Sequence, residues 1–127
     1  MPFLPCIGNN RGQAMVELAI VLPVVILILM GIFEFGRVFY AYQMVTNASR
    51  EGARLAALGR PDSEVVERAT AAAGPVGTLE VSISPPPGTR SRGTPVTVTV
   101  STRVEVSIPF FADKSYIVRG STTMMVE

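Results

Sequence analysis

One acidic residue stands inside the most apolar part of the chain, close to a glycine. Glu17 follows Gly12 by five residues, within residues 11 to 17, which read RGQAMVE. A carboxylate in a membrane helix is costly and normally has a partner. If the chain were cut after Gly12, Gln13 would carry a new ammonium group one helical turn from Glu17, on the same face. The two charges could then neutralise each other at the bilayer edge, within one chain or between neighbouring chains.

The helix that must position these residues is predicted from the apolar segment that follows. Residues 18 to 33 carry no charge, and twelve of these sixteen are Leu, Ile, Val or Phe. At roughly 0.3 to 0.6 kcal/mol each, these side chains favour membrane insertion by about 4 to 7 kcal/mol. With residues 13 to 17 in front, the segment is long enough to span a bilayer core. A buried core helix is the alternative, but residues 59 to 127 are too few to enclose one.

The sequence beyond the span predicts that the same helix continues into water. No turn signal occurs before residues 59 to 61, so we expect one helix to about Ala57, on the order of 65 Å long from Gln13. That length exceeds the thickness of a bilayer. One stripe of residues recurs in five steps over seventeen residues, a mean spacing of 3.4, and predicts helix packing against a partner. The stripe consists of Val38, Tyr42, Val45, Ala48, Gly52 and Leu55.

Pro23 and two charge pairs are further features of this predicted helix. Pro23 removes one backbone hydrogen bond within the span, which predicts a kink. It is either a tolerated membrane proline or a flexible point used when the chain moves from the bilayer into an assembly. Glu34 with Arg37, and Glu51 with Arg54, are spaced to form ion pairs. We expect all four side chains to be solvated.

The remaining residues predict a small α+β module that leans on the upper part of the long helix. Residues 62 to 73 read as a short helix, and residues 79 to 84 alternate as a strand. A longer strand follows, then a last strand over residues 116 to 126 that we expect to be interrupted near Arg119 and Gly120. The expected sheet is antiparallel, with three or four strands. One face of the longer strand holds Val96, Val98 and Val100, and Val104, Val106 and Ile108 keep the same parity.

Composition excludes several functions. Eleven Lys and Arg against ten Asp and Glu leave a formal charge of +1, so there is no basic field for nucleic acid. Without His, and with Cys6 as the single cysteine, no catalytic triad, thiolate zinc site or intrachain disulfide can form. Arg90 and Arg92 form no binding cluster, and we expect both to be solvated. We therefore expect no enzyme activity, cofactor, metal or small-molecule substrate.

The residues around the junction and along the helix resemble type IV prepilins, and more closely the TadE-like pseudopilins of the tight-adherence (Flp-type, type IVc) pilus. The resemblance covers residues 11 to 57. Two departures are Leu18, where the family often has Phe, and a leader with a single basic residue. The matching residues are Gly12, Ala14, Val16, Glu17, Ala19, Pro23, Gly31, Glu34, Gly36, Arg37 and the string NASREGAR at 47 to 54.

The resemblance implies three parts and a set of partners. Residues 1-12 would be a leader removed by a prepilin peptidase after Gly12, at a site that includes Gln13 and Glu17, and Cys6 would leave with it. Residues 13-57 would be the transmembrane and stem helix, and 58-127 an extracytoplasmic module.

A single pass through the bacterial inner membrane would place that module in the periplasm or outside the cell, associated with the pilus. The implied function is that of a minor pilin or pseudopilin that assists pilus assembly or related secretion. Its partners would be the membrane, the peptidase, other pilin-like subunits and the assembly platform. The alternative is an uncleaved single-pass protein whose β-rich module binds a ligand or partner.

Overall fold

The computed structural model describes residues 10–127. Cys6 and most of the predicted leader lie outside the described residues. Two helices precede three strands, which form one antiparallel sheet. This is the expected α+β architecture, with three strands. The elements are α1 (Asn10–Ala57), α2 (Asp62–Ala73), β1 (Leu79–Ser84), β2 (Pro95–Val106) and β3 (Lys114–Met125).

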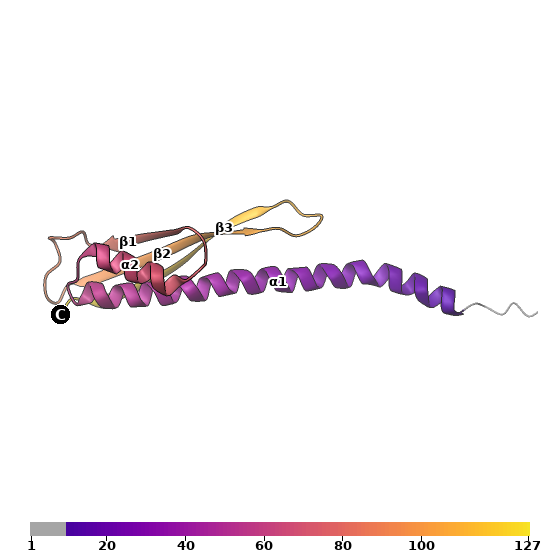
Figure 1. Ribbon diagram of the computed structural model, residues 1–127, viewed down its shortest axis with the longest axis horizontal. Coiled ribbons are helices and arrows are strands. Elements are labelled where there is room, and N and C mark those ends of the chain that lie inside the picture. The colour runs from indigo at the N-terminus through magenta and orange to yellow at the C-terminus, as the bar shows by residue number, and fades with distance from the viewer. Residues whose placement is uncertain (1–9) are drawn as a thin grey trace, which may run out of the picture.

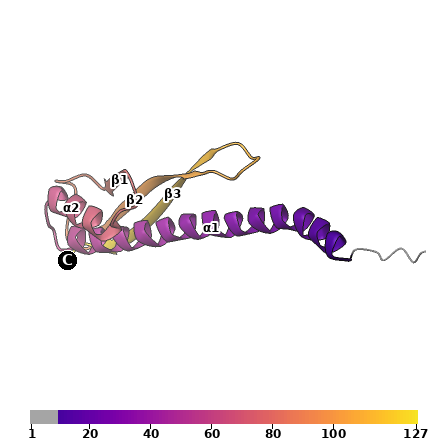
Figure 2. The same ribbon diagram turned by 45° about the vertical axis from the view of Figure 1, so that its right-hand side comes forward.

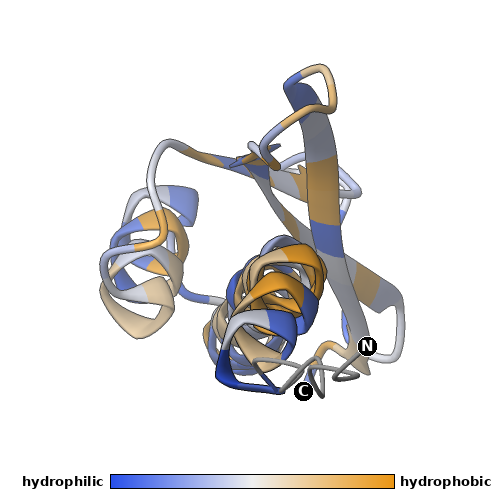
Figure 3. Ribbon diagram, turned by 90° about the vertical axis from the view of Figure 1, so that its right-hand side faces the viewer, coloured by the Kyte–Doolittle hydropathy of each residue, from blue (hydrophilic) through white to orange (hydrophobic). Residues whose placement is uncertain are grey.

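Helix α1 runs the length of the molecule and serves as its axis (Figure 1). Its 48 residues correspond to about 72 Å at 1.5 Å per residue. The sheet and α2 cover only its carboxyl-terminal half (Figures 1 and 2), and the view along α1 in Figure 3 shows them on different sides of the helix. Pro23 lies within the helix without ending it, and the amino-terminal end of α1 bends away from the axis of the rest in Figures 1 and 2. The bend agrees with the kink predicted at this proline.

Strand β2 is the centre of the sheet and supplies most of its core. It pairs with β1 on one side and β3 on the other, so that Val100 faces Val81 and Gly120 in the two ladders. Val96, Val98 and Val100 are fully buried, which confirms the predicted inward face. Alternation of apolar and polar residues places one face of a strand against the core.

The core is built almost entirely of alanine and valine, so α1, α2 and the sheet lie close together. Helix α1 contributes Val45, Ala48, Ala53 and Ala56, while α2 contributes Val65, Ala69 and Ala73, all fully buried. Gly52 extends this pattern, because a Cβ there would lie 3.0 Å from Val98 Cγ1. The small side chains thus allow three elements to share one narrow interior.

The predicted interruption of the last strand near Arg119 and Gly120 is wrong. Strand β3 pairs with β2 without a break from Lys114 to Met125. At Gly120 the strand crosses α1 so closely that a Cβ would lie 2.7 Å from the backbone nitrogen of Thr46. The glycine is therefore required for the close approach of two backbones, not for a turn.

Replacing Gly120 with alanine should destabilise the module. The added methyl group would force β3 away from the backbone of α1, a type of overpacking that costs about 1 to 3 kcal/mol. Chemical denaturation of the full chain in detergent measures the change. Gly36→Ala is the matched control, because nothing lies within 4 Å of its added Cβ. Equal stability of the two variants would contradict the close approach.

Candidate functional site

The residues of the predicted processing site lie on the first turns of α1. Gly12, Gln13 and Glu17 are all exposed and helical. Nε2 of Gln13 donates a hydrogen bond to Oε1 of Glu17 at 3.4 Å. The structure therefore places residue 13 and the carboxylate one turn apart on one face, as the spacing indicates. A positive charge on the backbone nitrogen of Gln13 would stand near a carboxylate that can accept it.

The apolar segment that follows has no cover from the rest of the described chain. Helix α1 is long and apolar enough to cross a membrane, and none of its most apolar 18-residue stretch is buried. Large side chains are exposed all around it, from Met15 through Ile20 and Ile28 to Phe33. A helix that is apolar on every side requires an apolar environment. The segment therefore fits a membrane anchor.

A charge pair with a buried carboxylate and a half-exposed arginine marks the end of this segment. Glu34 is 8% exposed, and its Oε2 lies 3.4 Å from Nη2 of Arg37 without forming a hydrogen bond. Arg37 also donates a hydrogen bond to the backbone oxygen of Glu105, near the end of β2. The expectation that all four paired side chains are solvated is thus wrong for Glu34. Arg37 connects α1 to the β2–β3 hairpin at the level where the apolar segment ends.

The second predicted pair links the two helices. Glu51 Oε2 lies 3.2 Å from Arg54 on α1, which confirms that pairing, and 3.5 Å from Arg68 on α2. Both arginine side chains are more than half exposed. Exposed pairs of this kind contribute little to stability. They nevertheless place a second cation from α2 beside the stem.

The residues of the predicted packing stripe do not share one open surface. Val45, Ala48 and Gly52 are buried under the chain's own sheet and α2. Val38 and Leu55 are partly buried against the same core. Tyr42, by contrast, is 50% exposed. In the described chain the stripe therefore has an internal partner, and Tyr42 is its most accessible member.

An exposed apolar surface lies beside Tyr42, in a shallow groove between α1 and β3. We call it the helix–strand groove. The rings of Phe35 and Phe39 lie parallel within it, 6.5 Å apart. This surface joins the uncovered apolar part of α1 to the module, and exposed patches of this kind commonly mark interaction sites. The groove is lined by Phe35, Val38, Phe39 and Tyr42 of α1 and by residues 116 to 119 of β3.

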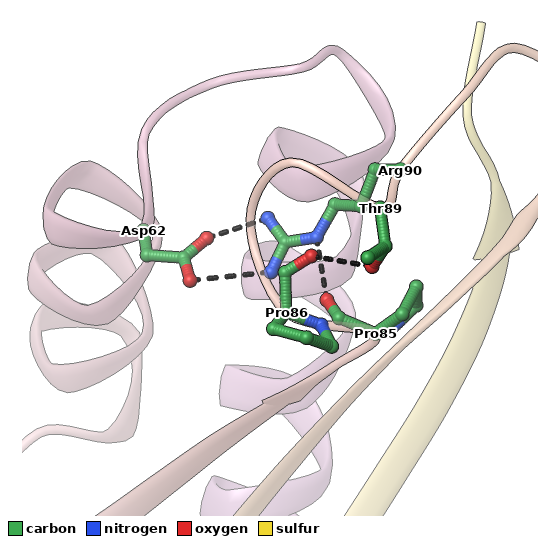
Figure 4. Close-up of polar contacts among 5 residues, drawn as sticks. All are labelled: Asp62, Pro85, Pro86, Thr89 and Arg90. Carbon is green, nitrogen blue, oxygen red and sulfur yellow. Dashed lines mark hydrogen bonds and ion pairs between the residues drawn. The ribbon is translucent and has the colours of Figure 1, made fainter.

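Arg90 is not solvated, contrary to the sequence-based expectation. Its side chain is 11% exposed and forms two hydrogen bonds to the carboxylate of Asp62, at 2.5 and 3.2 Å (Figure 4). Its Nε donates a third bond to the backbone oxygen of Pro85 at 2.8 Å. Arg92 stays exposed as expected. Arg90 therefore fastens the β1–β2 loop to the start of α2 and is not available to bind an anion.

Loss of this contact should loosen the β1–β2 loop. We expect Asp62→Asn to lower the free energy of unfolding by about 1 to 2 kcal/mol, because hydrogen bonds to charged groups are worth about 1.5 to 3 kcal/mol. Glu64→Gln is the control. It removes a first-turn charge from the same helix, but the ion pair of Glu64 with Arg60 is 4.0 Å long and exposed. A denaturation midpoint for Asp62→Asn no lower than that of Glu64→Gln would count against the contact.

Comparison with known proteins points to one family. The family model described as TadE-like protein matches residues 12–54. Nothing among the curated proteins or the solved structures matches the chain significantly. Within residues 10–127, no three His, Cys, Asp or Glu side chains gather as metal ligands. The match covers the junction, the apolar segment and most of the stem, and it confirms the resemblance seen in the sequence: residues 12–54 are similar to the TadE-like family.

Proposed function

We propose that the chain is a minor pilin or pseudopilin that assists assembly of a tight-adherence pilus or of related secretion machinery. One observation carries the proposal. Helix α1 is continuous from Asn10 to Ala57, with a first half that is apolar and uncovered and a second half that is the spine of a folded module. The family match over residues 12–54 supports a role in this pilus system.

The proposed location is the bacterial inner membrane, crossed once. The uncovered apolar half of α1 supplies the anchor. The family resemblance favours an amino terminus at the cytoplasmic face and a module in the periplasm or outside the cell. In that orientation the Glu34–Arg37 pair lies at the outer boundary of the bilayer, where charged side chains can contact water and lipid headgroups.

Processing by a prepilin peptidase after Gly12 would complete the anchor. A residue without a side chain lets the scissile backbone enter a narrow site. Cleavage would then leave a positive amino group on Gln13, whose side chain already contacts Glu17 at 3.4 Å. This pair offsets the cost of holding a carboxylate at the bilayer edge, either within the subunit or against a neighbouring one. In this role the chain is a substrate and not a catalyst.

Two substitutions should separate processing from assembly. Gly12→Glu should block removal of residues 1 to 12, because a long charged side chain would stand at the scissile bond. Glu17→Ala should permit cleavage but impair pilus assembly, because the new amino group loses its carboxylate. Intact mass spectrometry of membrane-extracted chains reads the first effect, and pilus yield reads the second. A normal mature mass for Gly12→Glu would refute the proposed site.

A native chain that retains residues 1 to 12 would favour the uncleaved alternative, with a β-rich binding module.

The helix–strand groove is the proposed contact with another pilin-like helix. Its apolar side chains lie just beyond the outer bilayer boundary, where a neighbouring stem would run beside α1. Exposed aromatic residues are frequent anchors of such interfaces. Tyr42 lies in this groove, whereas Asn47 is exposed on the face of α1 turned away from it.

A photoreactive amino acid should therefore identify the partner from one face of α1 and not from the other. At Tyr42 it should give a crosslink to another pilin-like subunit in native membranes. At Asn47 it should give little product. Immunoblotting and mass spectrometry of the crosslinked bands provide the measurement. Equal crosslinking from the two positions would show that the groove is not the preferred contact.

A further inference from the structure

The β2–β3 hairpin points back toward the membrane-spanning end of α1. Gly120 of β3 lies against Thr46 of α1. Nearer the hairpin end, Glu105 pairs with Ser115, and its backbone oxygen accepts a hydrogen bond from Arg37. Arg37 lies nine residues before Thr46 on the helix. The strands therefore run from the module toward the amino-terminal half of α1. Figures 1 and 2 show the hairpin end beside the middle of the helix and away from the rest of the module.

The end of the hairpin reaches back beyond Phe33, so that it lies alongside the outer end of the apolar segment. Arg37 lies four residues beyond Phe33, which is about 6 Å along the helix. From Glu105 the chain continues for five residues to Phe110, which spans up to about 16 Å in extended form. The hairpin diverges somewhat from α1 in Figure 1, which shortens its reach along the helix axis. An anchor that spans the bilayer through residues 13 to 33 thus brings Phe110 to the outer bilayer interface.

The residues at this end are apolar and uncovered. We call residues 108 to 112, which read IPFFA, the hairpin tip. Phe110 is 94% exposed and Phe111 is 70% exposed. Moving both phenylalanine side chains out of water is favourable, because the hydrophobic effect scales with the apolar area removed from water. Asp113 and Lys114 follow directly, on the module side of the tip, where charged ends can stay in the headgroup region.

The backbone of the tip holds Phe110 in a conformation that favours glycine. The backbone nitrogen of Phe111 donates to the oxygen of Ile108 at 3.0 Å, and Phe110 has φ of 70°. With Pro109 before it, this is the pattern of a type II turn, whose third residue is usually Gly or Asn. A bulky residue in the left-handed region is strained, because its Cβ lies too close to the following carbonyl oxygen. The strain and the exposure together favour a role for the ring outside the chain.

We propose that the hairpin tip is a second membrane contact, which inserts Phe110 and Phe111 into the outer interface of the bilayer that holds α1. The inference rests on the membrane anchor in the proposed function. With two points of attachment, the module has a fixed tilt and rotation relative to the membrane. The helix–strand groove then faces along the membrane plane, toward neighbouring subunits. Moving the subunit into an assembly requires withdrawal of both the helix and the tip.

Tryptophan fluorescence tests the contact directly, because the chain contains no Trp. The full chain would be reconstituted in phosphatidylcholine vesicles with or without lipids brominated near the headgroup. A Phe111→Trp variant should show blue-shifted emission and lose most of its intensity with brominated lipid. Leu58→Trp, at an exposed position at the far end of the stem, should show neither effect. Emission from Phe111→Trp that resembles water and is not quenched would overturn the proposal.

Two further variants separate this failure from others. Ile26→Trp, within the apolar segment, reports the anchor itself. Quenching there without quenching in Phe111→Trp would contradict the tip contact alone, whereas no quenching in either would contradict the anchor as well. A blue shift in Phe111→Trp that disappears on dilution of protein into lipid, without bromine quenching, would identify a second copy of the chain as the occupant and would also overturn the proposal.

A charge at the tip should remove it from the bilayer without harming the fold. Phe110→Asp suits this purpose, because aspartate tolerates a positive φ better than bulky residues do. In the Phe111→Trp background it should reduce quenching to the level of Leu58→Trp, while circular dichroism of the chain stays unchanged. Persistence of full quenching would show that Phe110 does not enter the membrane.

Discussion

The backbone of β3 meets the backbone of α1 at Gly120, and the position of the whole module depends on this contact. No side chain separates the two elements there, since a Cβ would lie 2.7 Å from the nitrogen of Thr46. With this crossing fixed, the bond from Arg37 to Glu105 sets the direction of the hairpin. The module is thus built against the stem as one body, and its small alanine and valine core is sufficient because the stem supplies one wall.

The two halves of helix α1 suit two different environments, an apolar one and the interior of the folded module. Its first half offers bulky apolar side chains in all directions, as a lipid environment requires. Its second half offers Ala, Gly and Val on one face, which lets the sheet and α2 approach. The change occurs at Glu34 and Arg37, where a charged pair lies at the end of the apolar segment. Because the helix is continuous, movement of the apolar segment would be transmitted to the module without an intervening hinge.

Local pattern predicted the elements well, because helices and strands follow periodicities of a few residues. The continuous helix to Ala57, the short second helix and the inward face of Val96, Val98 and Val100 all agree with the structure. The errors concern contacts between distant segments. A glycine in a strand suggests a break, but the reason for Gly120 is the backbone of α1 that lies beside it. Two arginines in a loop suggest solvated side chains, but Arg90 binds Asp62, which is 28 residues away in the sequence.

The candidate site divides in the same way. The relation between Gly12, Gln13 and Glu17 depends on helical spacing alone, so it could be predicted. The helix–strand groove could not, because it combines residues of α1 and β3 that are far apart in sequence. The position of the hairpin tip could not either, because it depends on how β2 and β3 pack on α1. The stripe on the stem showed the same limit: its period is that of a packed face, but a period does not say whether the chain itself or another subunit covers that face.

Hydrogen–deuterium exchange of the full chain in lipid nanodiscs tests most directly whether anchor and module form one body. The account predicts slow amide exchange along α1 from the apolar segment to Ala57 without interruption, because every turn is covered by lipid or by the module. Rapid exchange confined to residues 34 to 40, between two protected regions, would contradict it. The molecule would then be a membrane anchor and a separate domain joined by a flexible tether.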